Sequence, residues 1–145
     1  MTISTILFVC TGNTCRSPLA EGLAQKWLKE HNHEGWLAVS AGIYAIDGMS
    51  TSSETLQALE NRGISYDGTS TLLTEEMAKE ATLVICMSES HLAVAKQFTE
   101  QAELLDPNGD VADPIGKGQS VYDALANQME KLIGNRLHTL IGQGD

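Results

Sequence analysis

Cys10-Thr11-Gly12-Asn13-Thr14-Cys15-Arg16-Ser17-Pro18 is the stretch of sequence that decides the fold. An apolar run at residues 6–9 comes before it and is typical of a buried strand. After it, apolar residues recur at helical spacing over residues 17–30, and Ser17 is a good N-cap residue for that helix. The stretch is therefore predicted to join a strand end to a helix start, where backbone N–H groups and the helix dipole favour an anion.

The side chains of this loop indicate which anion it binds. Gly12 and Asn13 tolerate positive φ, so the loop can curl and point its N–H groups inward. The Arg16 guanidinium is a planar fork of donors that suits a pair of phosphate oxygens. Cys10 is expected to be a thiolate, because a cation and a helix N-terminus lie beside it, and Ser17 is placed to donate to its sulfur. A thiolate beside an oxyanion site is a nucleophile for phosphorus, which predicts phosphatase chemistry.

Residues 10–21 resemble the phosphate-binding loop and first helix of the low-molecular-weight protein-tyrosine-phosphatase family. Within that family, the bacterial protein arginine phosphatases are the most similar group. Supporting matches are Ser40-Ala41-Gly42, Met87-Ser88-Glu89-Ser90-His91 and Asp113-Pro114, which are spread along nearly the whole chain. The residues expected to bind phosphate are Thr11, Gly12, Asn13, Thr14, Cys15, Arg16 and Ser17.

The long loop of residues 106–119 is expected to supply the acid that protonates the leaving group. Attack by the thiolate of Cys10 gives a cysteinyl-phosphate intermediate, which water then cleaves to inorganic phosphate. Two Asp-Pro pairs, at Asp106 and Asp113, are candidates for the acid, and the residues alone do not choose between them. The family resemblance implies the pair shortly before the last helix, which is Asp113. Both loops leave from strand ends, so they are expected to share one pocket.

Thr14 and Ile115 are the residues on which the predicted substrate depends. Relatives that take phosphotyrosine usually have a branched aliphatic residue at the position of Thr14 and an aromatic residue after the Asp-Pro pair. A hydroxyl and a carboxylate suit a guanidinium, because its N–H groups need acceptors when they are buried. Phosphoarginine on a protein is therefore the first expected substrate, and phosphotyrosine is the alternative within the family.

The other cysteines bear on two further hypotheses. Arsenate reductases share this loop but need two more cysteines a few residues apart after the third strand, where this chain offers only Cys86, a residue expected in the core. An arsenate reductase is therefore a less favoured alternative, as is a binding module, which has no use for a thiolate. Cys15 is expected to capture an oxidised Cys10 as a disulfide when peroxide is present.

Three positions outside the loop concern its support. The resemblance implies that Ser40 hydrogen-bonds Asn13 and braces the loop. The family often has a histidine six residues before the position of Thr74, and this chain has Gly68 there, so that contact is expected to be absent or replaced. His91 lies in the first turn of a predicted helix and is expected to have a capping or surface role, not a catalytic one.

The length favours a single domain over residues 1–145, and the apolar fraction of 42% favours a globular protein. Net charge is −10 with no basic cluster, so nucleic acid and anionic membranes are poor partners. No apolar run approaches the roughly 20 residues of a membrane span. The three cysteines do not form an even disulfide framework, which indicates a reducing cytoplasm. No cofactor or metal is expected.

The alternation of strands and helices predicts an α/β fold, with a central four-stranded parallel sheet and helices on both faces in three layers. Strands are expected at residues 6–9, 36–39, 82–87 and 102–105. Helices are expected at residues 17–30, 53–63, 74–80 and 88–98, and after a cap at Ser120. The residues expected to face the core from the second and last helices are Leu56, Leu59, Val121, Leu125, Leu132 and Leu140.

Overall fold

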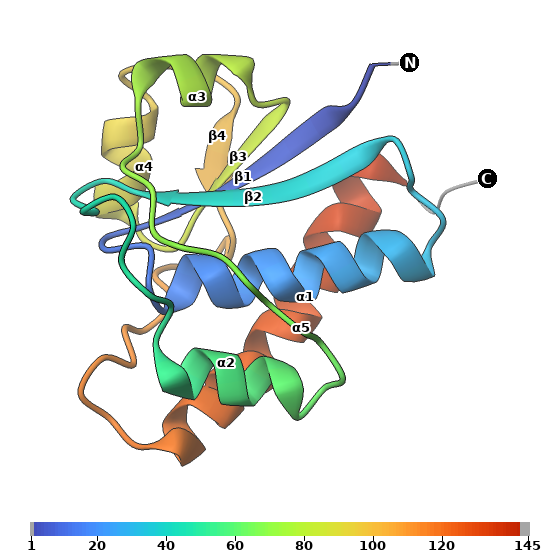
Figure 1. Cartoon of the computed structure of the whole chain (residues 1–145). Helices are drawn as coiled ribbons and strands as arrows, with labels where there is room; N and C mark the ends of the chain where they lie inside the picture. Colours follow the sequence, from blue (N-terminus) through green and yellow to red (C-terminus); the bar gives the residue numbers. More distant parts are fainter. Residues whose placement is uncertain (1, 143–145) are drawn as a thin grey trace.

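Four parallel strands form the centre of the protein in a computed structural model that describes residues 2–142 (Figure 1). They are β1 (Ser4–Cys10), β2 (Trp36–Gly42), β3 (Leu83–Cys86) and β4 (Ala102–Leu104), in the order β2-β1-β3-β4. β1 lies between β2 and β3 and is covered on both faces, which is why its sequence is apolar without alternation. Ile6 and Phe8 pack on one face of the sheet, and Leu7 and Val9 pack on the other.

Helices cover both faces of this sheet (Figure 1). They are α1 (Arg16–Glu30), α2 (Ser53–Glu60), α3 (Glu75–Glu80), α4 (Glu89–Ala95) and α5 (Gln119–Ile141). Residues of α1, α2 and α5 belong to the same buried cluster as Ile6 and Phe8, whereas residues of α3 and α4 belong to the cluster of Leu7 and Val9. The predicted three-layer α/β arrangement is confirmed. Within residues 2–142, no helix combines the length and the apolar character that crossing a membrane requires.

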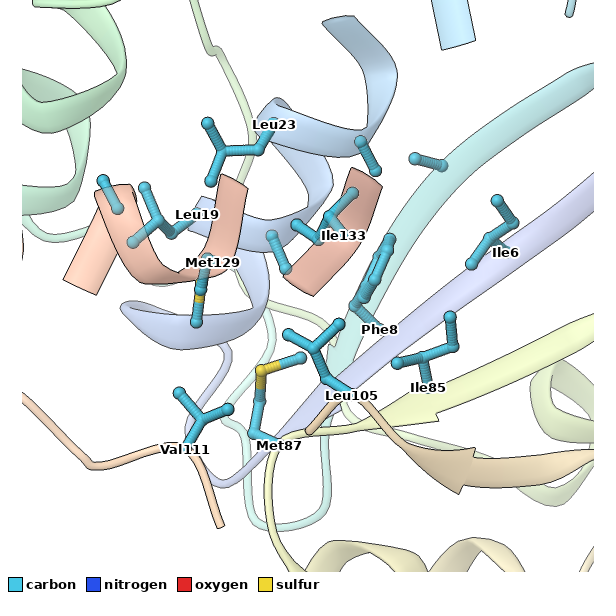
Figure 2. Packing of buried hydrophobic residues seen from close by; sticks show 14 of the residues in the cluster. Ile6, Phe8, Leu19, Leu23, Ile85, Met87, Leu105, Val111, Met129 and Ile133 are labelled. Carbon is cyan, nitrogen blue, oxygen red and sulfur yellow. The ribbon is translucent and has the colours of Figure 1, made fainter. Parts of the chain in front are cut away.

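The larger core lies between the sheet and the helices α1 and α5 (Figure 2). Phe8, Ile85 and Met87 contribute to it from the strand side, and Leu19 and Met129 contribute from the two helices. All five side chains are fully buried, and each such burial stabilises the fold by roughly 1.5–3 kcal/mol. This core holds α1 against the sheet, so the first turn of α1 is fixed relative to the end of β1.

The carboxyl ends of the strands meet at one edge of the sheet. Cys10 ends β1 directly beside Gly42, which ends β2. A Cβ atom at Gly42 would collide with the backbone of residues 10–17, so glycine lets this loop cross the end of β2. Val111, in the loop that follows β4, donates its N–H to the carbonyl oxygen of Met87 over 2.7 Å. Both predicted site loops therefore start at the same edge.

Two predicted helix starts are wrong. α1 begins at Arg16 with Cys15 as its N-cap residue, and Ser17 lies inside the first turn, fully buried. Asn13 adopts a left-handed φ of 58°, so the chain turns within the loop and the helix starts three residues later. α5 likewise begins one residue before Ser120, the predicted cap.

Two residues predicted to face the core are exposed, namely Leu56 and Val121, at 36% and 40%. The buried stripe of α5 consists of Tyr122, Leu125, Ala126, Met129, Ile133 and Leu137. Leu132 and Leu140 flank this stripe and are partly buried. At the start of α5, the position predicted to face the core was off by one residue. The amphipathic Tyr122 points inward in place of the β-branched Val121, and its hydroxyl lies within hydrogen-bond distance of Cys15.

Candidate active site

Cys10 places its sulfur at the centre of the 10–17 loop. Its Sγ lies 2.9 Å from Ser17 Oγ in the first turn of α1. The backbone N–H of Asn13 donates to the same sulfur over 3.3 Å. The thiol is 3% exposed, so the surrounding water contributes little and these two donors are what would stabilise negative charge on it.

Asn13 fixes the direction of the hydrogen bonds in the loop. Its Oδ1 accepts from the backbone N–H of Thr71 over 2.8 Å, which sets the orientation of the amide. Its Nδ2 then donates to Ser17 Oγ over 2.7 Å and to Ser40 Oγ over 2.9 Å. Ser17 Oγ accepts from Asn13, so its hydroxyl hydrogen can be donated to Cys10 Sγ at 2.9 Å, with the carbonyl oxygen of Ala41, at 3.5 Å, as the more distant acceptor. Ser40 lies where the family resemblance implied.

A half-buried carboxylate, Glu21, continues this network away from the loop. The Ser40 hydroxyl donates to Glu21 Oε1 over 2.6 Å, and the Tyr66 hydroxyl donates to the same oxygen over 3.0 Å. Burial raises the pKa of Glu21, and the two hydrogen bonds oppose that shift. The Tyr66 ring lies across Gly68, where a Cβ atom would come within 2.6 Å of the tyrosine oxygen. Tyr66 therefore fills the space that a side chain at position 68 would need.

Arg16 is the buried cation of the site. Its Nη1 donates to the carbonyl oxygen of Val111 over 3.0 Å, and its Nη2 donates to Thr11 Oγ1 over 3.4 Å. The carboxylate of Asp113 lies 3.6 Å from the same Nη2. Cys15, the N-cap of α1, makes no side-chain capping bond, so the N–H groups of the first turn add to the positive potential of the guanidinium. This combination favours a multiply charged oxyanion.

Of the two candidate acids, the structure brings Asp113 and not Asp106 to Arg16. The side chain of Asp113 is 47% exposed, and its Oδ1 accepts from the backbone N–H of Ile115 over 3.1 Å. Asp106 instead closes a local turn, with its Oδ1 accepting from the backbone N–H of Asn108 over 2.9 Å. Asp113 is thus the carboxylate that faces the cradle formed by the 10–17 loop.

The remaining cysteines have contrasting surroundings. Cys15 is buried, with its sulfur 3.3 Å from the Tyr122 hydroxyl and 3.9 Å from Thr14 Oγ1. Cys86 lies in β3 as predicted, and burial raises the pKa of its thiol to about 12. A disulfide between Cys10 and Cys15 stays a prediction.

His91 is where sequence analysis was wrong, since the side chain is buried beneath the 10–17 loop and not at the surface. Its Nε2 lies 2.8 Å from Thr11 Oγ1, and its Nδ1 lies 2.8 Å from Ser88 Oγ. Burial, followed by the charge of Arg16, lowers the pKa of His91 to about 4. The other residues that sequence analysis missed are Glu21 and Tyr66.

Comparison with known proteins agrees with this geometry. The sequence model of the low molecular weight phosphotyrosine protein phosphatase family matches residues 5–143. The chain belongs to this family. The prediction that it is a low-molecular-weight protein phosphatase, a cysteine-dependent hydrolase, is confirmed.

Relatives of this phosphatase carry two kinds of name. A protein-arginine-phosphatase of Bacillus subtilis is 34% identical over 88% of this chain and 91% of the relative. A low molecular weight protein-tyrosine-phosphatase, PtpB of Staphylococcus haemolyticus, is 32% identical over 89% of this chain and 94% of the relative. A solved structure of the YwlE arginine phosphatase, a mutant with a phosphorylated active-site serine, has a TM-score of 0.86 at 30% identity and covers 94% of this chain and 95% of that one.

Proposed function

We propose that this phosphatase hydrolyses phosphoarginine on proteins through a cysteinyl-phosphate intermediate. The observation that carries the proposal is the convergence of three groups at one edge of the sheet. The Cys10 sulfur lies within the 10–17 loop, and Arg16 is the first residue of α1. The Asp113 carboxylate lies 3.6 Å from the Arg16 guanidinium. Nucleophile, oxyanion site and acid are the parts that phosphoryl transfer needs.

In the first step, the thiolate of Cys10 attacks phosphorus and forms the S–P bond while the P–N bond to the guanidino nitrogen breaks. Asp113, as the carboxylic acid, gives its proton to that nitrogen, so arginine leaves as a guanidinium. Arg16 and the N–H groups of the 10–17 loop stabilise the charge on the three equatorial oxygens. The Ser17 hydroxyl, 2.9 Å from the sulfur, stabilises the thiolate before the attack.

In the second step, water attacks the phosphorus of the cysteinyl phosphate and the S–P bond breaks. The Asp113 carboxylate takes a proton from that water, and inorganic phosphate leaves. Ser17 again donates to Cys10 Sγ, which makes the thiolate a better leaving group. A covalent phosphoryl group on the protein is supported by the relative whose mutant carries a phosphorylated active-site serine. A reducing cytoplasm suits an enzyme whose three cysteines are free thiols.

Thr14 supports phosphoarginine as the substrate. It is half-buried at the wall of the cradle and can accept a hydrogen bond from a guanidinium N–H. Asp113, 3.6 Å from Arg16, offers a second acceptor. A planar cation whose N–H groups lose water needs such partners, since an unpaired one costs roughly 1–3 kcal/mol.

Phosphotyrosine is the second candidate, and a specific observation favours it. Tyr44 and Ile115 are 76% and 65% exposed, and the Tyr44 N–H bonds the Thr11 carbonyl oxygen, so an aromatic side chain stands at the rim. An exposed aromatic rim suits a phenyl ring. Arsenate reduction has little support, because Cys86 is the cysteine after Cys15 and it is buried in β3.

Turnover of both substrates by the wild type and by two Thr14 variants tests the proposal. The wild type should have the higher kcat/KM for phosphoarginine. Thr14→Ile removes the hydroxyl and adds a methylene, so it should lower that value and raise kcat/KM for phosphotyrosine by about ten- to a hundredfold. Thr14→Ser keeps the hydroxyl and is the matched control, which should retain the preference of the wild type.

A wild type that prefers phosphotyrosine would contradict the substrate assignment and leave the phosphatase mechanism standing. A wild type that hydrolyses neither substrate would contradict both.

A further inference from the structure

His91 is a buried imidazole that the two-step mechanism does not use. The carbonyl end of β3 leads into α4, and the first turn of α4 carries His91 to a position beneath the 10–17 loop. The side chain is 1% exposed and belongs to a helix that contributes no other group to the cradle described above. A polar ring is costly to bury in this way unless its nitrogens have defined partners.

The contacts of His91 have a direction that follows from Arg16. A guanidinium can only donate, so Thr11 Oγ1 is the acceptor of the bond from Arg16 Nη2. The Thr11 hydroxyl hydrogen is then available for His91 Nε2, 2.8 Å away. On the other side of the ring, Nδ1 lies 2.8 Å from Ser88 Oγ, which is itself 2.9 Å from Ser90 Oγ. With the proton on Nδ1, every bond in this series runs in the same direction, from Arg16 to Ser90.

We propose that His91 is a positioning residue for Arg16, which it holds in place through the Thr11 hydroxyl. The inference rests on the proposed function only in that Arg16 is taken to bind the phosphoryl group. Nε2 accepts the hydroxyl hydrogen of Thr11 and so turns the oxygen lone pairs toward the guanidinium. Arg16 is thereby fixed at Nη1 by the Val111 carbonyl and at Nη2 by Thr11.

Burial, together with the charge of Arg16, keeps the His91 ring neutral, which this role requires. Arg16 of α1 faces it and disfavours a second cation, while Asp110 and Asp113 of the loop after β4 act in the opposite direction. Glu89 lies on α4 itself, where its backbone N–H is bonded to Asp110. The pKa of His91 falls to about 4, so Nε2 keeps its lone pair at neutral pH. A protonated ring would instead donate to Thr11 and compete with Arg16 for the same oxygen.

Two substitutions separate a positioning role from a packing role, because each keeps a different hydrogen bond of the ring. One keeps the bond of Nε2 to Thr11, and the other keeps the bond of Nδ1 to Ser88. In His91→Gln, the side-chain amide reaches as far as Nε2 and can accept from Thr11. In His91→Asn, the amide reaches only as far as Nδ1 and can bond only to Ser88. We expect the Asn variant to lose about tenfold in kcat/KM and in affinity for inorganic phosphate, and the Gln variant to recover most of both.

Removing the hydroxyl gives an independent test that leaves the histidine intact. Thr11→Val should reproduce the loss of His91→Asn, and the double variant should lose no more than either single variant, because both break the same connection. His33→Asn is the matched control, since that ring stacks on Trp27 beyond the far end of α1, and it should behave as the wild type. Melting temperatures measured on all variants report any loss of fold separately.

Phosphate affinity, measured by calorimetric titration, decides the outcome. Equal affinities for His91→Asn, His91→Gln and the wild type, or additive losses in the double variant, would overturn the positioning role. If the wild type hydrolyses phosphorylated substrates, and the His91 and Thr11 variants keep the phosphate affinity and kcat/KM of the wild type, the positioning role is wrong and the proposed function stands. If the wild type neither binds phosphate nor turns over either substrate, the proposed function is wrong as well.

Discussion

The 10–17 loop and the 106–118 loop leave the same edge of the sheet but are held in different ways. In the first, Asn13 is 2% exposed, and its side chain makes one hydrogen bond within the loop, to Ser17, and two to distant segments, at Ser40 and Thr71. In the second, the side chain of Asp113 is about half exposed and bonds within its own turn to Ile115. One loop is braced from several sides, and the other carries its carboxylate near the surface.

This difference matches the two tasks of a phosphatase. A cradle for a transition state needs donors that are fixed before the substrate arrives. An acid needs to reach a leaving group that enters and departs with each turnover, so local exposure is an advantage. Changes to the braced loop should therefore affect binding or eliminate chemistry, whereas changes to the acid loop should slow turnover and leave binding intact.

The largest effect is expected from Cys10→Ser. It should lower turnover by at least about 10³-fold, because a serine hydroxyl is not ionised at neutral pH. Binding of inorganic phosphate should stay close to that of the wild type, since Arg16 and the loop N–H groups do not depend on the sulfur. Kinetics combined with phosphate titration checks both parts, with Cys86→Ala as a control for loss of a buried thiol. Turnover above a tenth of the wild type would rule out Cys10 as the nucleophile.

Asp113→Asn should lower turnover by roughly 10²–10⁴, the usual contribution of a general acid. Its affinity for inorganic phosphate should be equal to or higher than that of the wild type, because a carboxylate beside Arg16 repels the anion. Asp106→Asn is the matched control in the same loop and should have little effect, since an asparagine oxygen can still accept from Asn108. A reversal of the two results would show that Asp106 is the acid.

Much of the braced loop was predictable from sequence because its chemistry is local. The residues that carry it all lie in the 10–17 loop, between an apolar strand and an amphipathic helix, namely Cys10, Asn13, Arg16 and Ser17. The parallel sheet and the shared edge also followed from the alternation of elements, since parallel strands bring their carboxyl ends together. Ser17 was expected both to cap the helix and to donate to the Cys10 sulfur. The first expectation was wrong, because Cys15 is the N-cap residue, whereas Ser17 Oγ does lie 2.9 Å from Cys10 Sγ.

The side chains that support the 10–17 loop were not predictable, because they come from distant parts of the chain. His91 is 80 positions from Thr11, and Tyr66 is 45 positions from Glu21. A histidine early in a helix resembles a capping or surface residue, and burial is decided by how α4 packs. A glycine at position 68 indicates that a side chain is missing there, but not that a nearby tyrosine fills the space. Two further predictions test these braces.

Acid should destabilise the protein through His91. Its pKa is 6.5 in an unfolded chain and about 4 in the folded protein, so between these values the unfolded state binds more protons. Stability that is present above pH 6.5 is therefore lost as the pH falls toward 4, by about 2–3 kcal/mol for this group.

Urea unfolding at pH 7 and at pH 4.5 measures this contribution by difference. His91→Gln should lose less stability between the two pH values than the wild type, whereas His33→Asn should lose as much. Equal losses for the wild type and His91→Gln would mean that the ring is not held neutral by its surroundings.

The smallest effect is expected at the outer end of the network, at Tyr66 and Gly68. Tyr66→Phe removes one of two donors to Glu21 Oε1 but leaves Ser40 in place, so kcat/KM should fall by about three- to tenfold. Gly68→Ala should reproduce this loss, because its Cβ would lie 2.6 Å from the Tyr66 oxygen and push the ring away from Glu21. Gly35→Ala is the matched control, since a Cβ there has no neighbour within 4 Å among the described residues.

The fall in kcat/KM should come with slower alkylation of Cys10 by iodoacetate, because Glu21 connects to the sulfur through Ser40, Asn13 and Ser17. A variant with lower kcat/KM but unchanged alkylation would show that Tyr66 supports the fold of this region without acting on the nucleophile, and the braces of the 10–17 loop would then end at Ser40.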